Sequence, residues 1–176
     1  YPMILAIKKL AYALAAGNTF ILKPSPITPA TGLAIAEVFE AAGLPAGVLN
    51  VVPGRSEVIG DMLVDDPRVR MVTFTGSSAV GRSIAVRAAR DLKKVAMELG
   101  GKNPLIVLKD FDPVQAADIA AYGAFCHQGQ VCMATSRIIV EGDGYQPFCD
   151  ALVRRAEGLK VGDPREEDTI IGPLIQ

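Results

Sequence analysis

Glu98 and Cys132 carry a carboxylate and a thiol that can act together on one substrate. Glu98 lies at the end of a short apolar stretch and is followed by Gly100 and Gly101. Glycines permit close backbone approach and unusual φ angles, and a carboxylate at such a place can serve as a general base. The alternative is a structural glutamate that pairs with Lys102 on a tight turn.

Cys132 follows the polar, glycine-containing sequence Gln128–Gln130. A thiol on such a turn is exposed enough to react, and nearby backbone N–H groups favour its thiolate form. Cys126 and Cys149 lie in more apolar surroundings, which is typical of packed cysteines. We expect no metal site, because one histidine, His127, and three scattered cysteines lack the spacing of metal ligands.

An anion site is predicted where a strand runs into Gly76 and a helix follows at once. Free N–H groups at a helix start, together with the helix dipole, attract a phosphate. Gly76 would let the phosphate approach the backbone, and Ser77 could donate its hydroxyl. The spacing from Gly76 to Gly81 is not the common three-glycine dinucleotide fingerprint. An ordinary turn with Ser77 as the helix cap therefore stays open as an alternative.

Lys23 ends another apolar run, immediately before Pro24. It is either a solvated strand end or a donor to ribose hydroxyls or phosphate. In the loop that follows, Thr28 is expected to cap the next helix, with Pro29 at its first position.

Strands and helices alternate along the chain, which predicts an α/β fold with a mostly parallel sheet. The expected strands are 19–23, 48–52, 69–75, 94–99, 104–108 and 136–141, and the expected helices are 3–16, 30–42, 56–63, 77–90, 113–125 and 145–158. Such sheets bind ligands at the carboxyl ends of their strands, where Lys23, Gly76 and Glu98 fall. We expect a domain boundary near Gly100–Gly101.

Composition fits a globular protein and disfavours several classes of partner. The chain has 176 residues, half of them hydrophobic, and a formal net charge of −1. No basic stripe indicates nucleic-acid binding, and the apolar run 3–16 contains Lys8 and Lys9 and is too short to span a membrane. Three cysteines without a signal peptide favour free thiols and a cytoplasmic location. The start at Tyr1 favours a piece of a longer protein.

Four ordered motifs together resemble the aldehyde dehydrogenase superfamily, over essentially the whole chain. Glu98–Lys102 is similar to that family's general-base motif, and Gln128–Cys132 to its nucleophile motif, at the usual separation. Phe74–Ser77 resembles the pyrophosphate loop, and Lys23–Pro24 the ribose-binding strand end.

The resemblance implies a fold and a reaction. The fold would be a Rossmann-like parallel sheet from a cofactor domain, residues 1–99, joined to part of an α/β catalytic domain, residues 100–176. Cys132 would attack a small-molecule aldehyde, which could be aromatic, to give a thiohemiacetal and then a thioester, with hydride transfer to NAD or NADP, and Glu98 would activate the hydrolytic water. The implied cofactor-binding residues are Lys23, Ser25, Pro26, Gly54, Thr75, Gly76, Ser77 and Leu99. A homo-oligomer is also implied.

Two positions depart from the common family pattern. Pro26 stands where many NAD-preferring members carry a glutamate, so NADP is expected to be tolerated. His127 stands where most members have asparagine, which resembles the branch that acts on aromatic aldehydes such as vanillin, salicylaldehyde or benzaldehyde.

Two alternatives remain open. The thioester could be resolved by coenzyme A, giving an acylating dehydrogenase. The chain could also be an incomplete piece that only folds and associates, because the family's oxyanion asparagine would precede Tyr1 and its nicotinamide-ribose glutamate would follow Gln176.

Overall fold

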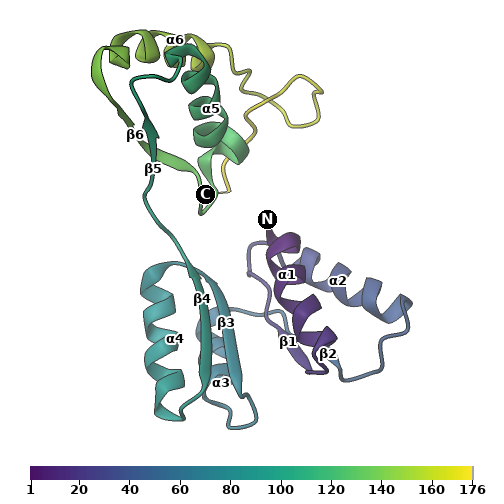
Figure 1. Ribbon diagram of the computed structural model, residues 1–176. Helices are drawn as coiled ribbons and strands as arrows, with labels where there is room; N and C mark the ends of the chain where they lie inside the picture. Colours follow the sequence, from purple (N-terminus) through teal and green to yellow (C-terminus); the bar gives the residue numbers. More distant parts are fainter. Residues whose placement is uncertain (176) are drawn as a thin grey trace. The chain divides into compact units, whose positions relative to one another are not determined.

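The structure is a computed structural model that describes residues 1–175, and it divides into two compact units, Tyr1–Leu99 and Gly100–Gln176 (Figure 1). The first unit contains α1 (Pro2–Ala15), β1 (Phe20–Leu22), α2 (Pro29–Ala41), β2 (Leu49–Val51), α3 (Ser56–Asp65), β3 (Met71–Gly76), α4 (Ser78–Arg90) and β4 (Lys94–Leu99). The second contains β5 (Asn103–Val107), α5 (Pro113–Phe125), η1 (Cys126–Gly129), β6 (Thr135–Val140), η2 (Gly142–Gly144) and α6 (Tyr145–Glu157). No helix among residues 1–175 has the length and apolar character needed to cross a membrane.

Parallel strand pairs confirm the predicted α/β fold. In the first unit β1 pairs with β2 and β3 pairs with β4, and in the second β5 pairs with β6, all in parallel. Hydrogen bonding within residues 1–175 leaves these as separate two-stranded ladders. Each pair therefore still has open edges at which further strands can add.

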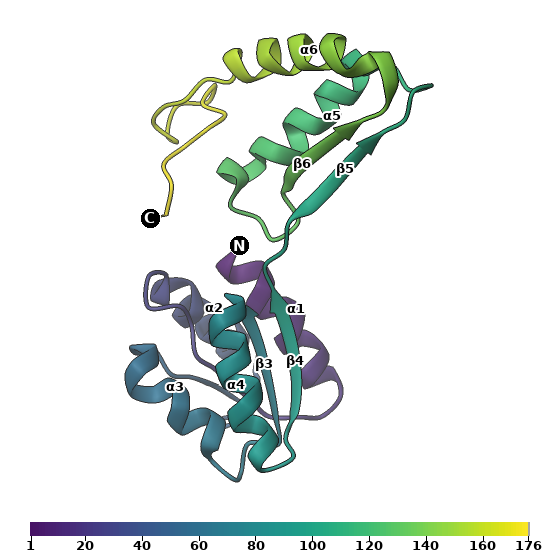
Figure 2. The ribbon, with the colours of Figure 1, turned by 90° about the vertical axis from the view of Figure 1, so that its left-hand side faces the viewer.

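The core of the second unit forms where α5 meets α6 and the β5–β6 ladder (Figure 2). α5 begins where the Asp112 side chain accepts a hydrogen bond from the Gln115 N–H at 2.8 Å, which satisfies one of the free donors of the first turn. Its buried face consists largely of alanines, and small side chains let neighbouring helices approach closely. The buried cluster comprises Val107, Ala116, Ala117, Ala120, Phe148 and Ala151.

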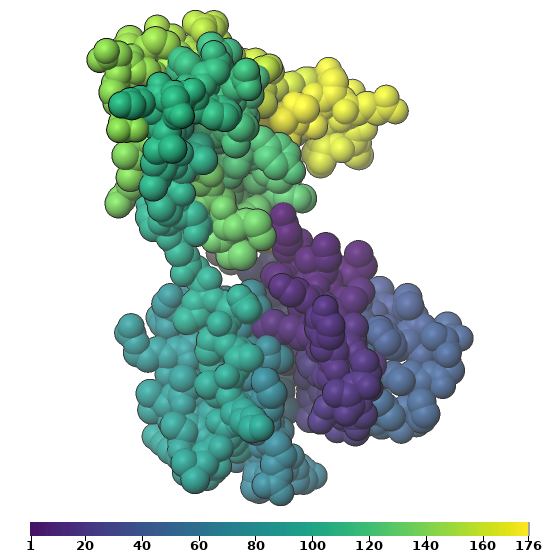
Figure 3. Space-filling view, in the orientation of Figure 1, coloured from purple at the N-terminus to yellow at the C-terminus, as the bar shows by residue number. Residues whose placement is uncertain are grey.

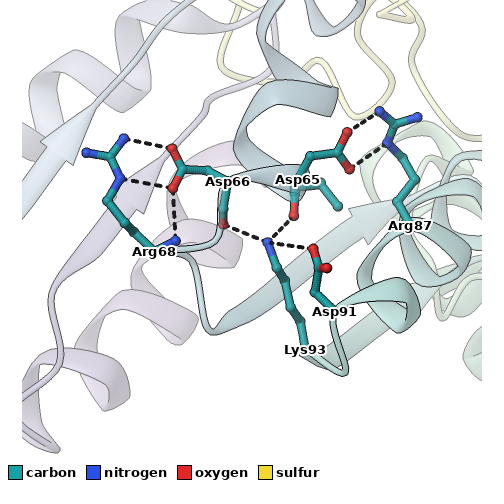
Figure 4. Close-up of polar contacts among 7 residues, drawn as sticks. Asp65, Asp66, Arg68, Arg87, Asp91 and Lys93 are labelled. Atoms are coloured by element: carbon teal, nitrogen blue, oxygen red, sulfur yellow. Dashed lines mark hydrogen bonds and ion pairs between the residues drawn. The ribbon is translucent and has the colours of Figure 1, made fainter.

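A buried lysine fixes the amino-terminal ends of β3 and β4 (Figure 4). The Lys93 side chain is only 4% exposed, and its ammonium donates to the Val64 and Asp66 carbonyls, both at 2.6 Å. Nearby, Arg87 of α4 forms ion pairs with Asp65 and Asp61 of α3. These contacts join the end of α3 to the α4–β4 turn. They lie at the opposite ends of β3 and β4 from the predicted ligand site, so their role is structural.

The loop after β1 differs from the prediction in one respect. Pro29 is the first helical residue, as expected, but the side chain of Thr28 makes no capping hydrogen bond. Ser25 closes the turn instead: its carbonyl accepts from the Thr28 N–H at 3.1 Å and its hydroxyl accepts from the Ile27 N–H at 3.3 Å. The prediction that Thr28 caps this helix through its side chain is therefore wrong.

Candidate active site

The register of β3 and β4 brings the predicted phosphate loop beside the predicted base. Thr75 pairs with Glu98, and Gly76 pairs with Leu99. Four residues singled out from the sequence thus lie together at the carboxyl ends of two parallel strands. That end of a parallel sheet is where α/β proteins place their ligands.

Ser77 performs the capping role that the sequence left open. Its hydroxyl accepts a hydrogen bond from the Val80 N–H at 3.3 Å, and its carbonyl accepts from the Gly81 N–H at 2.9 Å. The N–H groups of Ser78 and Ala79 precede the first intrahelical bond, and both residues are exposed. A cap and an anion site are compatible here, because the cap uses one donor and leaves two for a ligand.

Gly76 leaves room for the ring of Phe74. A Cβ at this position would clash with Cζ of the Phe74 ring unless that ring moved. Gly81 is similarly restricted, since a Cβ there would lie 2.6 Å from Cδ2 of Leu99. The buried hydroxyl of Thr75, next to Gly76 in the chain, has no hydrogen-bond partner within the described residues. A buried hydroxyl without a partner is uncommon in a folded protein, and this one is free to contact a ligand or a water at the strand end.

Lys23 and Gly54 follow the other strand pair of this unit. The Val52 N–H donates to the Leu22 carbonyl at 2.9 Å, which continues the ladder to its carboxyl end. Lys23 is half-buried, and its ammonium donates a hydrogen bond to the Pro24 carbonyl at 3.1 Å. Its other donors form no hydrogen bond within residues 1–175, so they can serve an acceptor from outside the chain.

Ser25 and Pro26 are both exposed beside this strand end. The Ser25 hydroxyl accepts from a backbone N–H, so its hydrogen remains to donate. Gly54 is half-buried, and a Cβ there would lie 3.0 Å from Cδ1 of Ile59.

Lys9 of α1 is a functional candidate that the sequence reasoning missed. Burial lowers the pKa of its ammonium, and attraction to the Glu98 carboxylate opposes that shift. A partly buried cation therefore stands near the exposed carboxylate of the predicted base. The available signal was the pair Lys8–Lys9 in an otherwise apolar helix. Nothing local in the sequence places that pair next to a residue so far along the chain.

Cys132 is the exposed thiol of this chain, whereas Cys126 and Cys149 are half-buried, and all three are free. Cys126 terminates α5, and Cys149 packs beside the buried cluster of the second unit. Exposure is what a reactive cysteine requires. Among residues 1–175, no three His, Cys, Asp or Glu side chains are placed to hold a metal ion.

Asn103 holds the backbone of the predicted nucleophile in place. Its side-chain amide donates to the Cys132 carbonyl at 2.8 Å and to the Ala134 carbonyl at 3.1 Å. The ladder between β5 and β6 shifts register between Asn103 and Pro104. The amide thus supplies donors where the regular strand pairing is interrupted. Sequence reasoning did not identify this contact.

Comparisons with known proteins identify one family over the whole chain. The model of the aldehyde dehydrogenase family matches residues 1–176. A vanillin dehydrogenase from Amycolatopsis sp. is 50% identical over 175 residues, which is 99% of this chain and 36% of that protein. A benzaldehyde dehydrogenase [NAD(+)] from Pseudomonas putida is 49% identical, with 99% of this chain and 36% of that protein covered. The chain thus spans about a third of the length of these relatives.

Solved structures show the same fold. Betaine aldehyde dehydrogenase from Staphylococcus aureus in complex with NAD+ superposes with a TM-score of 0.97 at 40% identity, covering 100% of this chain and 35% of that one. An NADP-dependent enzyme from E. coli superposes with a TM-score of 0.96 at 41% identity, covering 99% of this chain and 36% of that one.

Proposed function

Because this chain belongs to the aldehyde dehydrogenase family, we propose that the full-length protein oxidises an aldehyde to a carboxylic acid, with NAD or NADP as hydride acceptor. The observation that carries the proposal is the exposed Cys132 thiol in the family's nucleophile motif, with its carbonyl held by Asn103. Relatives that act on aldehydes and bind either nicotinamide cofactor support it.

The residues of the first unit fit a dinucleotide. The N–H groups of Ser78 and Ala79 suit a pyrophosphate at a helix start. The unpartnered Thr75 hydroxyl offers a polar contact at the same strand end. The Lys23 ammonium can donate to ribose hydroxyls or to phosphate. When bound, the nicotinamide supplies a hydride acceptor.

The chemistry of the chain's own residues then follows. The Cys132 thiolate attacks the aldehyde carbon, so a C–S bond forms and the carbonyl oxygen becomes an oxyanion; loss of hydride leaves a thioester. Backbone N–H groups at the nucleophile can stabilise the oxyanion. Glu98 takes a proton from water, whose oxygen attacks the thioester carbonyl. The C–S bond breaks, Cys132 leaves as the thiolate, the acid is released, and Glu98 passes its proton to solvent.

We also infer that the substrate is an aromatic aldehyde. The support is the similarity to vanillin and benzaldehyde dehydrogenases at 50% and 49% identity, together with His127 beside the nucleophile turn. The measurement is kcat/KM for vanillin and benzaldehyde against propanal in the full-length protein. Equal or lower values for the aromatic aldehydes would contradict this inference.

The decisive experiment on the reaction uses the full-length protein with Cys132→Ser and, as a matched control, Cys149→Ser. We expect the first change to abolish aldehyde-dependent cofactor reduction and the second to preserve it. Mass analysis of the product with coenzyme A present separates hydrolysis from acyl transfer. A thioester product would favour the acylating alternative, and activity that survives Cys132→Ser would contradict the proposal. A chain of residues 1–176 that folds but never reduces cofactor, while the full-length protein does, would favour the incomplete-piece alternative for this chain.

Family membership further supports a homo-oligomer in the cytoplasm. Large apolar side chains stand exposed on the second unit, including Ile106, Leu108, Phe111 and Ile119. Exposed apolar surface of this kind is usually covered by another part of the chain or by a partner. Light scattering on the full-length protein measures its oligomeric state.

A further inference from the structure

The backbone just before Cys132 turns through three successive left-handed residues. His127 has φ 51° and ψ 41°, Gln128 has φ 60° and ψ 25°, and Gly129 has φ 71°. Residues with a Cβ rarely adopt this region, because the Cβ crowds the following carbonyl. Two such residues in succession persist only where the surroundings hold them, and such places cluster at functional sites.

The side chains of Gln128 and Gln130 hold this turn against the segment Gly172–Ile175, which we call the clasp segment. With its amide oriented to satisfy both groups, Gln128 donates to the His127 carbonyl at 2.8 Å and accepts from the Gly172 N–H at 2.8 Å. The oxygen of Gln130 accepts from the Ile175 N–H at 3.1 Å. The two glutamines therefore hydrogen-bond to the clasp segment at both of its ends.

The residue before the clasp segment is itself held by the chain that follows α6. Val161 and Ile171 form an isolated parallel bridge, the Gly162 N–H donates to the Ile171 carbonyl at 3.0 Å, and the Ile171 N–H donates to the Lys160 carbonyl at 2.9 Å. The loop between these points, residues 163–170, projects from the second unit (Figure 3). Because α6 packs on α5, and α5 ends immediately before the left-handed turn, the clasp joins the turn to the rigid part of the unit.

We propose that Gln128 and Gln130 are positioning residues that fix the Cys132 turn by binding the main chain of the clasp segment. This role rests on the proposed function of Cys132 as the nucleophile. A nucleophile must be held close to its productive geometry by neighbours that are themselves fixed. Both contacts with the clasp segment use backbone N–H groups as donors, so each glutamine must present an acceptor oxygen at the right distance. Gln128 in addition needs its amide N–H, which donates to the His127 carbonyl, whereas Gln130 needs the acceptor alone.

Acceptor chemistry suggests a matched pair of variants. Gln130→Met keeps the length of the side chain and removes the acceptor, whereas Gln130→Glu keeps an acceptor oxygen. Ile175→Pro removes the N–H donor from the other side. Gln146→Met is the control, because Gln146 makes a comparable exposed hydrogen bond, to Asp150 at 2.8 Å, on α6.

Amide hydrogen exchange of the full-length protein is the first measurement. We expect Gln130→Met and Ile175→Pro each to speed exchange in the peptide that spans Gly129–Ala134 by at least about threefold, the scale of one lost net hydrogen bond. Exchange in α5 and α6 should stay unchanged, and the double variant should add little to either single change. Gln130→Glu and Gln146→Met should resemble the parent. Uniformly faster exchange across the unit, or no change at the turn, would overturn the proposal.

Kinetics supply the second measurement. In the full-length enzyme, Gln130→Met should lower kcat for the aldehyde by about tenfold, leave the Kd of the cofactor unchanged, and be rescued by Gln130→Glu. An equal loss of kcat in Gln130→Met and Gln130→Glu would show that the acceptor oxygen of Gln130 is not what positions the turn. The exchange measurement needs no turnover, so it tests whether the glutamines hold the turn independently of catalysis. Activity in the Cys132→Ser protein would contradict the proposed function without changing the conclusion from hydrogen exchange.

Discussion

Asn103 donates both hydrogens of its side-chain amide to the main chain around Cys132, to the Cys132 carbonyl at 2.8 Å and the Ala134 carbonyl at 3.1 Å. We predict that Asn103→Asp in the full-length enzyme lowers kcat by about tenfold, roughly 1.4 kcal/mol. The replacement preserves the shape of the side chain, but a carboxylate oxygen then faces the Cys132 and Ala134 carbonyl oxygens and repels them. Asn50→Asp is the matched control, since Asn50 donates to the Gly47 carbonyl away from this turn. Steady-state kinetics of both variants, with melting temperatures, provide the check.

The second prediction concerns the three thiols. Cys132 is exposed, while Cys126 and Cys149 are half-buried. Limited treatment of the native protein with iodoacetamide, followed by peptide mapping, should modify Cys132 first, because alkylation needs an accessible thiolate. Faster modification of Cys126 or Cys149 would remove the assignment of Cys132 as the nucleophile. Labelling in denaturant, where all three are accessible, gives the reference rates.

The third prediction separates the two halves of the reaction. Glu98→Gln should slow deacylation more than hydride loss, because hydride leaves before a water is activated. Stopped-flow measurement should therefore show a burst of reduced cofactor followed by slow turnover. Glu57→Gln on α3 is a suitable control for loss of a carboxylate. If the burst disappears together with the steady rate, Glu98 is not the base for thioester hydrolysis.

Local patterns were sufficient to predict most helices and strands. β4 and α5 have the predicted bounds, and the other elements differ by a few residues at their ends. The reason is that glycine and proline breaks, together with runs of apolar residues, act over a few neighbouring positions. The prediction that the Thr28 side chain caps α2 was wrong, because Ser25 makes the hydrogen bonds of this turn instead.

Contacts between distant parts of the chain could not be predicted. The Glu98 carboxylate acts electrostatically on Lys9, the Asn103 amide donates to the Cys132 carbonyl, and the Gln130 oxygen accepts from the Ile175 N–H. Each pair depends on the path of the chain between its members, which local propensity does not encode. The register that sets Thr75 beside Glu98 likewise emerges only from strand pairing.

The fourth prediction concerns stability and pH in the second unit. The Arg155 guanidinium on α6 holds the pKa of Asp118 on α5 below its ordinary value of 3.8, chiefly through their hydrogen bond. A depressed carboxyl pKa gives a stabilisation that is present above 3.8 and is lost as the pH falls through the folded-state value.

Asp118→Asn should therefore lower the urea midpoint at pH 7, and the difference from the parent should shrink below pH 3.8. Asp143→Asn is the control, at an exposed carboxylate without an ion-pair partner among residues 1–175. A difference that stays constant down to acid pH would show that packing, and not the charged pair, is lost. Because both partners are largely exposed, the effect should also weaken in high salt.

The last prediction concerns the choice between NAD and NADP. Pro26 is exposed at the end of β1, with the Ser25 hydroxyl and the Lys23 ammonium close by in the chain. A carboxylate at this position would accept hydrogen bonds from the two ribose hydroxyls and repel a 2′-phosphate. Its absence removes both a preference for NAD and a penalty against NADP. We therefore expect the full-length enzyme to use NADP with a kcat/KM within about tenfold of that for NAD, roughly 1.4 kcal/mol of discrimination.

Pro26→Glu should then raise the KM for NADP while changing kcat little, because the new charge acts on binding and not on the reacting atoms. Pro67→Glu is the control for an added surface charge, since Pro67 is exposed beside the buried Lys93 cluster at the other end of β3. Raising the salt concentration should reduce the discrimination by Pro26→Glu, because exposed charges are screened. If the parent already rejects NADP strongly, then a residue other than Pro26 excludes the 2′-phosphate. In that case Ser25 and Lys23 would not form the part of the site that contacts the adenosine ribose.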